Sequence, residues 1–83
     1  MPKTLPIPGL IRRLAQARER RGLTQRAAAR ILECHHTWIG QIERGESVPT
    51  TAWLARFAGL YLVSLDWLVG GGELSMDYGT VSP

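Results

Sequence analysis

Residues 24–45, TQRAAARILECHHTWIGQIERG, decide the fold of this 83-residue chain. Thr24 is a good helix N-cap, and the alanine-rich segment after it predicts a short helix over residues 25–32. Residues 33–35 interrupt the pattern, and two isoleucines share one face of a second short helix predicted over residues 36–44. The stretch therefore predicts two short helices that meet at a tight turn.

Three further helices are predicted on either side by apolar residues at intervals of three and four. One begins near Pro8 or Gly9 and ends at Gly22, one begins at Thr50 or Thr51, and a last short helix begins at Ser64. The first two of these helices have apolar stripes formed by Leu10, Leu14, Ala17, Leu54, Phe57, Ala58 and Tyr61. No strand-like alternation occurs before residue 73, so we expect an all-α domain of five short helices around one core.

Three segments divide the chain. Residues 1–8 contain three prolines and predict a flexible N-terminal arm, residues 9–70 form the helical domain, and residues 71–83 predict a flexible C-terminal tail. In that tail, apolar residues alternate with polar ones, as in a strand that pairs with its copy in a partner chain. The alternating residues are Leu74, Met76 and Tyr78. The tail is therefore a candidate dimer contact.

Positive charge is concentrated in one part of the chain. The net charge is +3 at pH 7, and residues 12–30 contain seven arginines against one acid, Glu19. A basic domain of this kind suits a polyanionic partner such as nucleic acid. The alternative is that these arginines are solvent-exposed side chains on helix faces and have no nucleic-acid partner.

The composition argues against several other classes of protein. Cys34 is the only cysteine, which excludes an intramolecular disulfide and a cysteine-rich zinc site, and its neighbours His35 and His36 would rarely converge with it on one ion. No apolar run could span a membrane and no signal-peptide pattern is present, so we expect a cytoplasmic protein. No catalytic constellation is found. We expect no metal, no cofactor and no enzymatic activity.

Several segments, at their mutual spacing, resemble the phage-repressor and Cro-like (XRE-type) helix-turn-helix family. The matching residues lie within about 9–70 and are Leu23-Thr24-Gln25, Ala29, Ile39, Ile42-Glu43-Arg44-Gly45, Pro49, Leu54, Ala58 and Ser64-Leu65-Asp66-Trp67-Leu68. The resemblance implies a compact five-helix lambda-repressor-like fold. It also implies sequence-specific binding of double-stranded operator DNA by a homodimeric transcriptional regulator, a repressor, associated with the nucleoid.

The resemblance assigns roles to individual residues. Those expected to reach base edges are His36, Thr37, Gly40 and Gln41, with Gly40 on the same exposed face as the others. Those expected at the DNA backbone are Gln25, His35, Trp38, Arg44 and Ser47, and Gln25 would also brace the start of the recognition helix. Arg18 and Glu43 match a structural ion pair. The residues that exceed the needs of the core, and that we assign to a dimer interface, are Leu60, Trp67 and Val69.

Side-chain chemistry supports the assignments at three of these positions. Glutamine, as at Gln41, makes a bidentate contact to adenine, and the methyl group of Thr37 can contact the thymine methyl. Histidine, as at His36, donates to guanine or to a phosphate. Ordinary surface roles for Thr37 and Gln41 remain the simpler alternative.

Some positions depart from the family pattern. Glu33 and Leu62 stand where glycine is frequent, so we expect Glu33 to hold a left-handed conformation at some cost. His35 replaces the usual Ser or Thr and either caps the helix or contacts a phosphate. Trp38 either covers the edge of the core or touches the DNA backbone. Cys34 is expected to pack in the core.

Two other functions stay open. An antitoxin-type regulator would bind DNA and also a small toxin protein, and co-purification of that partner would indicate it. A protein-interaction module without DNA binding would explain His35, His36 and Gly40 in place of more typical polar residues. The absence of any salt-sensitive binding to a random duplex would indicate this second case.

Overall fold

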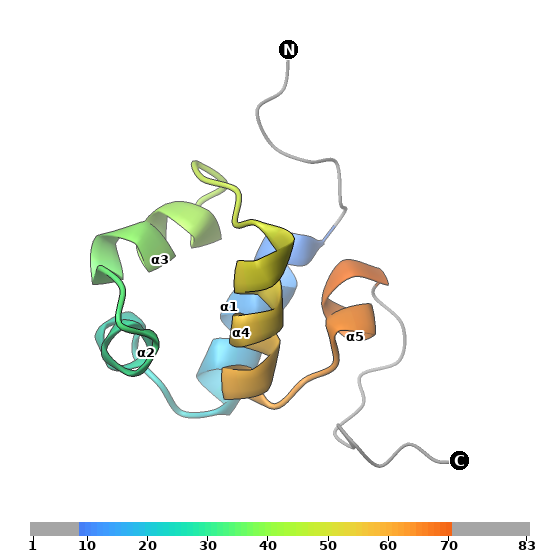
Figure 1. Ribbon diagram of the computed structural model, residues 1–83, viewed down its shortest axis with the longest axis horizontal. Coiled ribbons are helices and arrows are strands. Elements are labelled where there is room, and N and C mark those ends of the chain that lie inside the picture. Colours follow the sequence, from blue (N-terminus) through green and yellow to red (C-terminus); the bar gives the residue numbers. More distant parts are fainter. Residues whose placement is uncertain (1–8, 71–83) are drawn as a thin grey trace.

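The computed structural model describes residues 9–70, which form five helices and no strand. These are α1 (Leu10–Arg20), α2 (Gln25–Leu32), α3 (His36–Glu43), α4 (Thr51–Tyr61) and α5 (Leu65–Gly70). In Figure 1, α2 and α3 lie together on one side, α4 crosses the middle over α1, and α5 lies on the other side. The predicted five-helix, all-α fold is confirmed. The predicted arm, and the tail with its candidate strand at Leu74, Met76 and Tyr78, lie outside the described residues.

Apolar stripes from all five helices bury one core. Its largest fully buried side chains are Phe57, Ile39, Ile42, Leu68 and Val63. Burying a side chain of this size contributes roughly 1.5–3 kcal/mol, so the shared core is what holds such short helices together. None of the helices within residues 9–70 has the length and apolar character needed to cross a membrane.

Trp67 belongs to this core rather than to the surface. It is 6% exposed and packs with the buried apolar residues, so the expectation that it lies at a dimer interface is wrong. Leu60 is half-buried against the core, whereas Val69 is 37% exposed.

Hydroxyl side chains cap the N-termini of three helices. Thr24 Oγ1 accepts from the Ala27 amide over 3.0 Å, and Thr50 Oγ1 accepts from the Trp53 amide over 3.2 Å. Ser64 Oγ accepts from the Trp67 amide over 2.9 Å. These bonds satisfy amides that have no partner within their helix, which is why α2, α4 and α5 begin where the sequence predicted.

Left-handed residues end α2 and α4. Glu33 has φ 59°, as expected from its place in the sequence, and Leu62, which also stands where glycine is frequent, has φ 60°. The next amides, of Cys34 and Val63, then reach back to the carbonyls of Ala29 and Ala58 over 2.9 and 3.1 Å. This Schellman geometry satisfies late carbonyls of each helix and reverses the chain toward the core.

Three arginines stabilise helix C-termini. Arg56 Nη2 donates to the Leu32 carbonyl at the end of α2, over 3.0 Å. Arg21 and Arg13 donate in the same way to carbonyls in the last turns of α4 and α5, those of Leu60 and Leu68. Cations are favoured at these ends by the helix dipole. Part of the basic charge therefore serves the fold.

Candidate nucleic-acid interface

A buried ion pair fixes the C-terminal end of α3 to α1. Arg18 Nε and Nη2 donate to the two carboxylate oxygens of Glu43 over 2.8 and 3.0 Å, and Nη1 donates to the Leu23 carbonyl over 2.7 Å. Both side chains are 10% exposed, and the hydrogen bond to Glu43 raises the pKa of Arg18. The pair implied by the family resemblance is thus present, and it ties α3 to the rest of the fold.

Gln25, the first residue of α2, joins the same cluster. Its Nε2 donates to Glu43 Oε1 over 3.0 Å. The brace therefore reaches the last residue of α3, whereas we expected it at the start of that helix. The amide nitrogen carries two protons, so one N–H remains beyond the bond to Glu43.

Gly40 is buried, so the expectation of an exposed residue at this position is wrong. A Cβ atom there would lie 3.2 Å from Arg44 Nη1 and 3.3 Å from Gln25 Oε1. These two polar side chains lie across the helix at the place where a side chain would project. Gly40 therefore makes room for neighbouring groups, and we withdraw it from the base-contacting residues.

Arg44 extends from the end of α3 over this glycine. Glu46 holds its guanidinium with two hydrogen bonds, from Nε over 3.0 Å and from Nη2 over 3.1 Å. The bond raises the pKa of Arg44 and lowers that of Glu46. Because the side chains are 59% and 55% exposed, water screens the pair and the guanidinium can exchange its partner.

The other candidate base-reading residues are His36 and Thr37 in the first turn of α3 and Gln41 one turn further on. His35 Nδ1 accepts from the Thr37 amide over 3.3 Å, so His35 caps the helix. The His35 and His36 rings stack with their centroids 5.2 Å apart. Thr37 is exposed, and His36 and Gln41 are half-exposed. Three of the four predicted residues therefore share an accessible edge.

Trp38 lies between this edge and the core. Its ring meets Trp53 edge-on at a centroid distance of 4.8 Å, and its indole N–H donates to Ser47 Oγ over 3.0 Å. Of the two alternatives, covering the core edge matches this geometry. The bond also positions the loop that follows α3.

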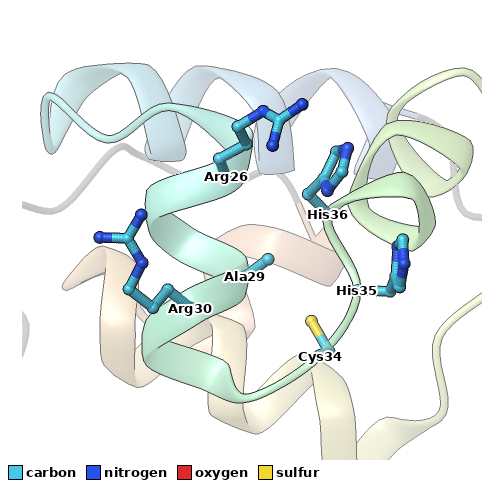
Figure 2. A pocket seen from close by; sticks show the side chains of 6 residues that line it. All are labelled: Arg26, Ala29, Arg30, Cys34, His35 and His36. Atoms are coloured by element: carbon cyan, nitrogen blue, oxygen red, sulfur yellow. The ribbon is translucent and has the colours of Figure 1, made fainter.

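A depression opens beside the histidines, between α2 and the start of α3. It has a volume of about 260 Å³, and Figure 2 shows Arg26 and Arg30 projecting from α2 while His35 and His36 stand opposite. Ala29 and Cys34 complete its lining. Cys34 is half-buried, and desolvation raises its pKa. Sequence reasoning did not single out Arg26 or Arg30, although their spacing of four residues on one helix was a signal.

Two comparisons with known proteins bear on this arrangement. A helix-turn-helix domain family model matches residues 10–68. The HTH-type transcriptional regulator ImmR of Bacillus subtilis (strain 168) is 38% identical over 64 residues, which are 77% of this chain and 50% of that protein. The chain thus spans about half the length of this relative.

Proposed function

The chain belongs to the helix-turn-helix domain family, and from this premise we propose that it binds double-stranded DNA and regulates transcription. The family is a class of non-catalytic domains, as the sequence led us to expect. The observation that carries the proposal is the accessible edge of α3 formed by His36, Thr37 and Gln41, in a helix held in place by the buried Arg18–Glu43 pair. An exposed helix edge on a rigid support is what docking into the major groove requires.

Base reading falls to three residues of that edge. Gln41 is suited to a bidentate contact with adenine, and Thr37 to the methyl group of thymine. His36 is suited to guanine or to a phosphate next to it. These assignments follow from side-chain chemistry and accessibility, and they leave Gly40 out because it is buried.

Backbone contacts fall to residues on either side of α3. Gln25 keeps one amide proton, and Arg44 can exchange Glu46 for a phosphate. Ser47 accepts its hydrogen bond from Trp38, so its own hydroxyl proton remains free to donate. His35 uses Nδ1 as an acceptor and therefore presents a donor at Nε2. We propose that Trp38 does not contact the DNA backbone itself but positions Ser47 for that contact through their hydrogen bond.

The experiment is selection of bound duplexes from a random pool, followed by titration of Gln41→Ala. We expect this variant to lose about 1–3 kcal/mol of binding free energy on the selected duplex and almost nothing on a random one. Gln16→Ala, an exposed glutamine of α1, is the matched control and should leave both affinities unchanged. Equal losses on both duplexes would remove Gln41 from base reading. No salt-sensitive binding by the parent protein would refute DNA binding itself.

We further propose that the protein represses transcription as a homodimer in the cytoplasm. One α3 covers few base pairs, and two copies related by symmetry would read half-sites about 34 Å apart. Exposed apolar side chains at the α4–α5 end, Leu62 at 49% and Val69 at 37%, support an interface there with half-buried Leu60. Sedimentation equilibrium of the chain with and without the selected duplex tests the stoichiometry.

A further inference from the structure

We infer that the depression between α2 and the start of α3 is a binding site for one backbone phosphate of the DNA, with Arg26 and Arg30 as its cationic wall. The inference rests on the proposed DNA binding and adds a contact site that adjoins the base-reading edge and shares His36 with it. Its ligand is a phosphodiester in a nucleic-acid strand rather than a free anion.

The depression forms because the small Ala29 lies between the long side chains of Arg26 and Arg30 on α2. Arg26 and Arg30 stand one helical turn apart on α2 and both line the depression, with Arg26 extending toward His36 and Arg30 extending away from it (Figure 2). Between them Ala29, only 3% exposed, contributes a methyl group to the floor, so the space above it stays open. The opposite wall is formed by His35 and His36, and the resulting volume of about 260 Å³ is open on one side. A phosphodiester can enter such a site while remaining part of its strand.

Among the residues that the structure describes, no acidic side chain pairs with the arginines of the site. Within residues 9–70, neither Arg26 nor Arg30 has an ion-pair or hydrogen-bond partner, whereas Arg18 is paired with Glu43 and Arg44 with Glu46. A phosphate in the depression would be attracted by both positive charges. Guanidinium groups also match phosphate oxygens through paired N–H donors.

The histidines add donors to the same site. Because His35 Nδ1 accepts from the Thr37 amide, its proton lies on Nε2, which remains a donor. The pKa of His36 is lowered by desolvation and by the nearby Arg26 and His35. A bound phosphate would oppose the effect of the positive Arg26 and favour the protonated imidazole of His36.

Other occupants fit less well. A metal ion would face two arginines, and no group of three or more His, Cys, Asp or Glu side chains gathers in residues 9–70. A strand of the duplex is favoured over a small anion because His36 forms both a wall of the depression and part of the α3 edge proposed to enter the major groove. A strand bordering that groove passes beside it.

The test is a titration of the Arg26→Gln/Arg30→Gln double variant with the selected duplex and with a random one, over a range of salt concentrations. One lost phosphate contact should reduce the slope of log affinity against log salt by about 1 and weaken binding about tenfold near 0.1 M salt, equally for both duplexes. Arg12→Gln is the matched control for general charge, because Arg12 is exposed on α1 and does not line the depression. Unfolding curves of all variants check that the fold is retained.

The results separate this inference from the proposed function. Unchanged affinity and slope in the double variant, while the parent protein binds DNA, would overturn the phosphate site and leave DNA binding standing. A loss confined to the selected duplex, or the same loss per charge in Arg12→Gln, would overturn it as well. A further experiment is an NMR titration of the parent protein with inorganic phosphate. If phosphate shifts the His36 imidazole signals while the double variant binds DNA normally, the site binds a small anion and not the DNA backbone.

Discussion

Glu33 shows at the scale of one residue how this fold departs from the usual chemistry of a turn. Its φ of 59° is a conformation that costs residues with a Cβ atom roughly 1–2 kcal/mol. The residue is held there because the Cys34 amide bonds the Ala29 carbonyl and α3 must begin immediately afterwards. The tight turn that sets α2 against α3 is therefore formed at the expense of stability.

Replacing Glu33 should recover part of that cost. We expect Glu33→Gly to have a free energy of unfolding about 1 kcal/mol higher than Glu33→Ala, because only glycine adopts this conformation without a steric penalty. Chemical denaturation of both variants measures the difference, and alanine serves as the control for the lost carboxylate. Equal stabilities of the two variants would contradict strain at this position.

At the scale of elements, α3 depends on a link formed by charged groups. The helix has eight residues, too few for independent stability, and its last residue is joined to α1 by the Arg18–Glu43 pair. Gln25 at the start of α2 bonds the same carboxylate. The three helices that position the proposed reading edge therefore meet at one side chain.

Removing one partner of this pair should be far more harmful than removing both. We expect Arg18→Met to lose about 3–5 kcal/mol of stability, because it leaves the Glu43 carboxylate buried without its cation. The Arg18→Met/Glu43→Leu double variant should recover most of that loss. Urea unfolding of the single and double variants provides the comparison, and a double variant as unstable as Arg18→Met would show that the pair is not the source of the effect.

The helices were predictable because their signals are local. Apolar spacing and the caps at Thr24 and Ser64 lie within one or two turns of the elements that they define. The burial of Gly40 and of Trp67 was not predictable, since it depends on which side chains other helices bring over them. The depression beside Arg26 likewise exists only once α2 and α3 have been placed together.

At the scale of the whole molecule, basic charge is divided between fold and surface. Arg13, Arg21 and Arg56 donate to helix carbonyls, and Arg18 is buried. The groups around His36 in the depression are Arg26, Arg30, Cys34 and His35. A net charge of +3 therefore understates the positive potential on the side of α2 and α3.

From this arrangement we expect DNA binding to depend on pH. The pKa of His36 is lowered in the free protein, first by desolvation and then by Arg26 and His35, and a phosphate nearby would raise it. Binding then takes up a proton, so affinity should increase as the pH falls from 7.5 to 5.5. Titrations at several pH values measure this, with His36→Gln as the variant that should reduce the dependence.

In the free protein, the lowered pKa of His36 has the opposite effect on folding stability, which should decrease as the pH falls. A histidine with a lowered pKa in the folded state contributes stability that is present above its ordinary pKa of 6.5 and is lost as the pH falls below it. Weaker binding at pH 5.5 by a protein that is still folded would contradict the proposed proton uptake.

The indole of Trp38 is an intrinsic fluorophore placed between the core and the proposed DNA contact. Its nitrogen is bonded to Ser47, a residue proposed to meet the DNA strand, and its ring touches Trp53 at the edge of the core. Light emitted by indoles depends on the polarity and contacts around the ring. The same side chain that closes the hydrophobic interior can therefore report events on the nucleic-acid side, without a dye attached to either molecule.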